Sequence, residues 1–173
     1  MKKIFCIAMA AMLLLGFAAC KAAPGKGKGD TLTGTPEEVL IQVRESSHAI
    51  LATSAGNEIT GGSAMRVLGL TEEQFGELAE SAYAEMPVIG TVAQRIAIVK
   101  CVDIAAAEQV KKLIAEGFDA DQWAPGPGQC VVVESGSYVL LAVGTADATD
   151  ALVRAFGILC EDNAGTPEVF FAE

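Results

Sequence analysis

The chain has 173 residues, of which 51% are hydrophobic and 20% are charged, and its formal net charge at pH 7 is −10. This length predicts one folded domain, and the acidic balance does not suit contacts with phosphates, so we expect no nucleic acid partner. The sequence holds a single histidine, which argues against a zinc site built on several imidazoles.

The first twenty residues are typical of a bacterial signal peptide. Lys2 and Lys3 precede an apolar run over residues 4–19. That run is shorter than the roughly 18 to 20 residues that a membrane-spanning helix needs. It ends in Ala18-Ala19-Cys20, which resembles a lipobox, the site at which a cysteine thiol takes a diacylglycerol. One departure is Phe17, where the pattern usually has leucine.

We therefore predict a lipoprotein signal peptide over residues 1–19 and a lipid on Cys20. An ordinary cleaved signal and an uncleaved anchor are the alternatives. The lipid would hold the protein at the cell membrane, facing outside the cytoplasm. Loss of Lys2 and Lys3 with the signal lowers the net charge from −10 to −12.

Residues 20–35 are rich in glycine, lysine and small residues and lack apolar periodicity, which predicts a flexible tether. Lys21, Lys26 and Lys28 lie close to the predicted lipid. They could contact anionic headgroups, or they could simply keep the segment soluble.

Two helix starts are visible early in the globular part, which we place at residues 36–173. Thr35 can cap a helix that opens with Pro36-Glu37-Glu38, because proline suits a first turn and acids favour the positive end of the helix dipole. After an apolar segment over residues 61–68, Thr71 and Gln74 form a capping-box pattern. Apolar residues then recur at helical spacing, which predicts an amphipathic helix over residues 71–86.

The second half mixes strands and helices. An apolar run over residues 95–102 predicts a strand buried on both faces. Asp103 can cap the next helix, which we expect to end at a left-handed Gly117. A loop over residues 119–129 follows and contains Trp123.

Two further strands are predicted over residues 129–134 and 137–143, joined by a tight turn. A last helix begins near Thr145 and is expected to end at Gly157. The tail over residues 166–173 is too apolar to be wholly free in water. The order of elements predicts an α+β fold, with a small mixed or antiparallel sheet and helices packed on one face.

The segments Lys-Cys-Val-Asp (100–103) and Val-Val-Val-Glu-Ser-Gly-Ser-Tyr-Val-Leu-Leu (131–141), each followed by a helix, resemble a family of bacterial lipoproteins catalogued as DUF4358, a domain of unknown function. The segment Leu68-Gly69-Leu70 before an acidic helix start fits the family too. The resemblance covers roughly residues 35–156. It implies a cell-surface lipoprotein, and it implies no activity and no catalytic residues.

No catalytic set is visible. His48 lies beside two serines on a predicted helix, but neighbours on a helix point in different directions, so we interpret it as a partly exposed helix residue. Cys101, Cys130 and Cys160 remain after Cys6 and Cys20 are assigned to the N-terminus. Each of the three stands among apolar residues, which favours buried free thiols over a Cys-His pair or a disulfide.

We expect neither a metal nor a cofactor. Asp119-Ala120-Asp121 begins like a calcium loop, but Trp123 and Cys130 occupy later ligand positions. Trp123 is the remaining candidate for a binding residue. An indole on a proline-glycine loop can anchor a partner, although folding back over the core is the commoner outcome.

The function predicted from these features is a membrane-anchored, non-enzymatic module that binds an envelope protein or peptide or supports envelope assembly. The alternative is an extracytoplasmic enzyme with an unrecognised cysteine or carboxylate site.

Overall fold

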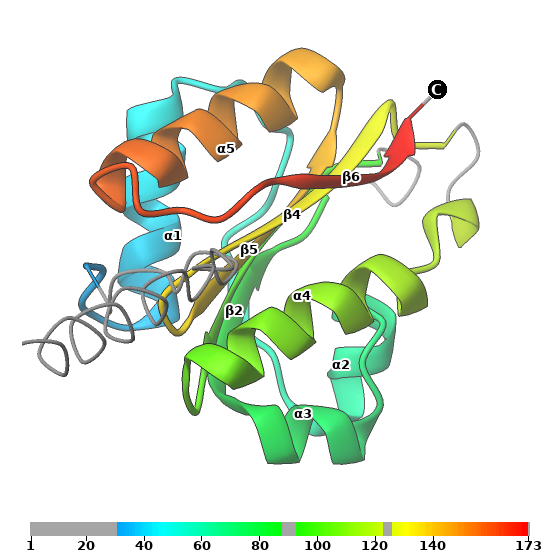
Figure 1. Ribbon diagram of the computed structural model, residues 1–173. Coiled ribbons are helices and arrows are strands. Elements are labelled where there is room, and N and C mark those ends of the chain that lie inside the picture. The colour runs from blue at the N-terminus through cyan, green and yellow to red at the C-terminus, as the bar shows by residue number, and fades with distance from the viewer. Residues whose placement is uncertain (1–30, 88–92, 123–125, 173) are drawn as a thin grey trace, which may run out of the picture.

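A computed structural model describes residues 31–87, 93–122 and 126–172 (Figure 1). The predicted signal peptide, Cys20, the lysines of the tether and Trp123 lie outside the described residues. The elements in chain order are α1 (Pro36–Ser47), β1 (Asn57–Glu58), α2 (Gly61–Leu68), α3 (Glu72–Leu78), β2 (Ala79–Glu85), β3 (Arg95–Cys101), α4 (Ile104–Gly117), a 3-10 turn (Ala120–Gln122), β4 (Gln129–Ser135), β5 (Tyr138–Gly144), α5 (Ala146–Leu159) and β6 (Glu168–Ala172).

The strands form one six-stranded sheet in the order β1-β2-β3-β5-β4-β6, and each pairing among the described strands is antiparallel. The predicted α+β class is therefore confirmed. The sheet is wider than the three predicted strands, because β1, β2 and β6 extend it at both edges. The apolar tail becomes β6, where Phe170 packs edge-on against Phe118 with ring centroids 5.8 Å apart.

Helices cover both faces of the sheet, so the expectation of helices on one face is wrong. Figure 1 shows α1 and α5 on one side and α2, α3 and α4 on the other. Strand β5 explains the arrangement, because all its residues are buried. Leu140 and Ala142 pack under α1 and α5, whereas Leu141 and Val143 pack against the other helices. A strand that is apolar at every position needs cover on both faces.

The predicted helix starts are confirmed. Thr35 and Glu38 form a reciprocal capping box at α1, and Thr71 and Gln74 do the same at α3. Asp103 Oδ1 accepts a 2.7 Å hydrogen bond from the backbone N–H of Ala106 at the start of α4. Each cap satisfies backbone donors that the first helical turn leaves without a partner.

The predicted helix over residues 71–86 is wrong beyond Leu78, because β2 replaces its second half. Ala82 lies opposite Val99 and Tyr83 opposite Ile98 in the ladder with β3. The alternation of side chains then puts Ala82 in the core under α2 and α4, and Tyr83 on the side of α1. Pairing with the buried strand β3 overrides the helical periodicity here.

Two helices also end differently from the sequence-based prediction. Helix α5 continues through Gly157 to Leu159. Gly117 is the last residue of α4 and does not adopt the left-handed conformation, which belongs instead to Gly69 after α2 (φ 78°).

Candidate functional site

The three cysteines of the domain are buried free thiols, as predicted. Cys101 and Cys130 share the core under α2 and α4, and Cys160 lies across the sheet in the other core. Cys101 donates its backbone N–H to Ser137, at the start of the β4–β5 hairpin, whereas Cys130 pairs with Val143 at the far end of β5. That offset is roughly 20 Å along a strand, far beyond the reach of a disulfide.

Burial also makes the thiols poor nucleophiles. It raises the pKa of Cys101 and of Cys130 to about 12 in each case. Burial raises the pKa of Cys160 as well, although a hydrogen bond with Ser135 opposes the shift. The thiolate is the reactive form of cysteine, and a neutral buried thiol does not supply it at neutral pH.

His48 lies at the end of α1, exposed and in the left-handed conformation at φ 54°. Cys101, Cys130 and Cys160 are buried whereas His48 is exposed, and among the described residues none of these thiols pairs with the imidazole. Residues 119–121 begin like a calcium loop in the sequence, and the structure describes their contacts. Asp119 Oδ1 accepts the backbone N–H of Asp121 at 3.0 Å, and the described residues contain no group of three or more potential metal ligands.

Trp123 and Cys20, the two residues predicted to bind a partner and a lipid, are not among the described residues. The buried Arg95 of β3 donates to the carbonyl oxygen of Val67 at 2.7 Å and lies 5.3 Å from the centre of the Phe118 ring. Burial lowers the pKa of Arg95 to about 10, so it remains a cation at neutral pH and joins α2 to the sheet.

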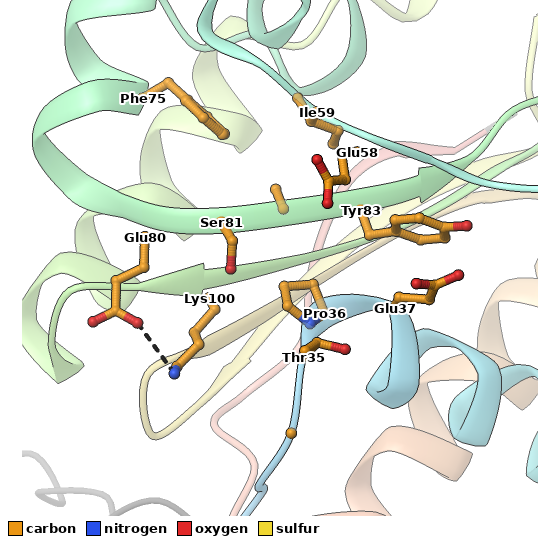
Figure 2. Close-up of a pocket in the computed structure, with 12 residues that line it drawn as sticks. Thr35, Pro36, Glu37, Glu58, Ile59, Phe75, Glu80, Ser81, Tyr83 and Lys100 are labelled. Carbon is orange, nitrogen blue, oxygen red and sulfur yellow. Dashed lines mark ion pairs between the residues drawn. The ribbon is translucent and has the colours of Figure 1, made fainter.

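An open cleft of about 380 Å³ lies where the outer edge of β2 passes the first turn of α1 (Figure 2). The start of α1 forms one wall, and the end of β1 together with Phe75 of α3 forms another. Between them, Ser81 and Tyr83 of β2 and Lys100 of β3 line the floor. The sequence analysis missed this cleft, because it placed residues 79–85 on a helix.

Local sequence explains why the cleft stays open. The backbone N–H of Ile59 donates to Ala82 at 2.8 Å, and the chain then turns into α2, where Thr60 and Ser63 form a capping box. Within the described residues, no strand therefore continues along the edge of β2 beyond Ala82. Helix α1 begins only at Pro36, so Ser81 of β2 stays exposed, and Lys100 opposite it in β3 is half-buried.

The cleft carries more negative than positive charge. Lys100 Nζ pairs with Glu80 Oε2 at 3.1 Å, and two further carboxylates, those of Glu37 and Glu58, stand on the rim. Burial, a hydrogen bond with Glu37 and the nearby carboxylates raise the pKa of Tyr83. A negative potential at the Tyr83 hydroxyl favours cations in the cleft over anions.

Behind the cleft, Glu85 is nearly fully buried and has two partners. Arg44 of α1 pairs with Oε1 at 2.8 Å, and the hydroxyl of Thr53 donates to Oε2 at 2.6 Å. This group fixes the last turn of α1 on β2.

Comparisons with protein families, with curated proteins and with solved structures return no match. The resemblance to the DUF4358 lipoproteins therefore stays a prediction. Among the described residues, no helix has the length and apolar character that crossing a membrane requires.

Proposed function

We propose that this protein is an extracytoplasmic lipoprotein, tethered by a lipid on Cys20, and that its domain binds a protein or peptide of the cell envelope at the cleft beside α1. The DUF4358 resemblance and the N-terminal pattern support the anchor. The open cleft is the observation that carries the binding role, because it combines apolar walls with charged and hydroxyl groups that can orient a ligand.

The position of the cleft supports the same role. Gly34 and Thr35, which line it, are the last two residues of the predicted tether. Two contacts fix this entry to the domain: the Tyr138 hydroxyl donates to the carbonyl oxygen of Gly34 at 2.7 Å, and Thr31 Oγ1 donates to that of Cys160 at 3.1 Å. A lipid on Cys20 would therefore keep the cleft within one tether length of the membrane surface.

Two measurements test the proposal. Mass spectrometry of the mature N-terminus should show a diacylglyceryl Cys20 as the first residue. A photo-crosslinking residue at the exposed Ser81 should capture a specific envelope component, whereas the same residue at Asp147, which is exposed in the first turn of α5, should not. An uncleaved chain without lipid would refute the anchor, and equal capture at both positions would refute the binding site.

A further inference from the structure

The C-terminal strand β6 and the residues just before it are held by β4 and α4. Gly165 donates its backbone N–H to the carbonyl oxygen of Glu134 at 2.8 Å, and the carbonyl oxygen of Thr166 accepts a 2.6 Å hydrogen bond from Lys111 Nζ. Strand β6 then pairs with β4, and its Phe170 packs against Phe118 at the end of α4. Residues 165–172 thus attach as one unit, which we call the C-terminal arm.

The arm is less enclosed than the strands beside it. None of the five residues of β6 is buried, whereas every residue of β5 is. The ladder between β6 and β4 is also interrupted by a register shift at Cys130 and Val131. An edge strand with exposed side chains and an interrupted ladder opens at a lower free energy than the centre of the sheet.

A short hinge, residues 161–164, connects the end of α5 to the arm (Figure 1). Glu161 and Asp162 adopt the left-handed backbone conformation there, at φ 52° and 59°. Elsewhere in the described ranges, His48 is the one other non-glycine residue with a positive φ. Both hinge residues carry a Cβ atom that is crowded in this conformation, so folding the arm back onto its own chain strains the hinge.

An extended hinge relieves that strain at little cost. In the closed turn, the backbone N–H of Asp162 donates to Gly157 at 3.0 Å and that of Asn163 donates to Cys160 at 2.9 Å. Because Glu161 and Asp162 are exposed, water takes the place of such bonds when the turn opens. The strand pairing and the Phe170 contact of the arm do not require the closed turn.

The surface that an open arm uncovers has one occupant that fits it, which is the arm itself. The edge of β4 and the ring of Phe118 accept the sequence Glu-Val-Phe-Phe-Ala of β6. A second copy of this chain carries the same arm, so an exchange between two copies rebuilds the contacts of each arm and alters only the hinges. A reciprocal exchange is a closed dimer with two-fold symmetry, in which no arm is left unpaired.

We propose that two copies of this protein exchange their C-terminal arms, so that β6 of each copy completes the sheet of the other. The partner is therefore a second copy of this chain, and the surface that binds it is the edge of β4. The cleft beside α1 lies at the opposite edge of the sheet, so this inference does not depend on the proposed binding function.

A disulfide trap distinguishes exchanged arms from closed ones. Gln129 of β4 lies opposite Ala172 of β6, so a Gln129→Cys/Ala172→Cys variant links the arm to whichever copy it pairs with. The mature chain is incubated at several concentrations in an excess of non-ionic detergent micelles, at a temperature just below its Tm, and then oxidised. Non-reducing gels should show a covalent dimer whose share grows with protein concentration. The unaltered chain, oxidised in parallel, reports any link through its own cysteines.

Order of treatment provides the matched control. Chains oxidised while dilute carry the disulfide within one copy, which locks the arm closed. When these chains are then concentrated, we expect them to remain monomeric by sedimentation, although their sequence and surface are the same as those of the chains oxidised last.

Hinge variants test the role of strain. Glu161→Gly/Asp162→Gly removes the strain from the closed turn and should raise the dissociation constant of the dimer by about tenfold or more, as measured by sedimentation. His48→Gly relieves the same backbone conformation at the end of α1, outside the hinge, and should leave that constant unchanged. All three residues are exposed, and circular dichroism checks that each variant keeps the fold.

A monomer at every concentration, or disulfides within single copies only, would overturn the exchange. Equal dimerisation of the chains locked while dilute would overturn it as well, because copies would then associate with their arms closed. If the cysteine pair does not oxidise, sedimentation of the hinge variants decides: equal dissociation constants for the hinge variant and His48→Gly would contradict the proposal. Specific crosslinking from position 81 is unaffected by any of these results.

Discussion

Gly69 and Gly117 meet backbone to backbone, where the turn after α2 crosses the last turn of α4. A Cβ atom on either residue would collide with the main chain of the other, and Gly69 also adopts φ 78°. The contact brings the buried Leu68 and Leu70 against α4, so the two glycines set the spacing between helices on that face.

Alanine at this contact should therefore destabilise the fold. We expect Gly117→Ala to lower the free energy of unfolding by about 2–3 kcal/mol, since no flexible side chain can yield. Gly69→Ala should lower it further because of its left-handed backbone. Gly157→Ala is the matched control: it lies inside α5 with open space around it and should stabilise by roughly 0.5–1 kcal/mol. Urea unfolding of the three variants measures the difference, and similar values at Gly117 and Gly157 would contradict the close contact.

Two adjacent lysines of α4 differ in burial and in ion pairing, so their contributions to stability can be compared within one helix. Lys111 Nζ pairs with Glu134 of β4 at 2.8 Å and donates to the carbonyl oxygen of Thr166 at 2.6 Å, in largely buried surroundings. Lys112 reaches Glu116 only at 3.9 Å, and both of those side chains are exposed.

Lys111→Met should cost about 1–2 kcal/mol of folding free energy and speed amide hydrogen exchange in β6, because the carboxylate of Glu134 loses its partner and the segment before β6 loses its anchor. Lys112→Met should change stability by less than about 0.5 kcal/mol. Equal effects of the two substitutions, or unchanged exchange in β6, would count against this anchoring role.

The buried thiols predict a fall in stability at alkaline pH. In the unfolded chain Cys101 and Cys130 ionise near the ordinary pKa of 9.0, whereas in the fold their pKa is about 12. The unfolded state therefore binds fewer protons than the folded state between those values, and the free energy of unfolding decreases as pH rises from about 9 to about 12.

Urea titrations at pH 8 and pH 10.5 measure this effect, with a double Cys101→Ala/Cys130→Ala variant as control for tyrosine and lysine titration. The variant should lose less stability over the same interval. Native thiols should also resist a thiol reagent until denaturant is added. Rapid labelling of the folded chain, or parallel pH profiles of the two proteins, would contradict the burial.

Helices and strands were predicted correctly from the sequence where a short local pattern agreed with the burial of the residues in the fold. Thr35, Thr71 and Asp103 correctly marked helix starts, because capping is decided by residues only three positions apart. The apolar run of β3 correctly predicted a strand. The helices on both faces could have been inferred from the same run, since continuous apolar character requires cover on each side.

The cleft could not be predicted, because it depends on partners far apart in the sequence. Glu58 and Tyr83 become neighbours only when β1 pairs with β2, and Lys100 reaches the floor only through β3. Residues 79–85 have no apolar alternation of their own. Their alanines and glutamates favour a helix, and the strand follows from the partner beside them.

In an isolated peptide of residues 71–86, residues 79–85 should therefore be helical, although they form strand β2 in the intact protein. Freed from β3, it keeps the Thr71–Gln74 capping box and a run of good helix formers, so we expect a helical circular dichroism spectrum in cold water, although a helix of this length is marginal. A peptide with Ala82→Val and Ala84→Val should lose most of that signal, because each valine costs roughly half a kcal/mol in a helix. An extended or random spectrum from both peptides would show that residues 79–85 favour the strand without help from β3. A helical spectrum from the first alone would show that pairing with β3, and not local preference, creates the edge of the cleft.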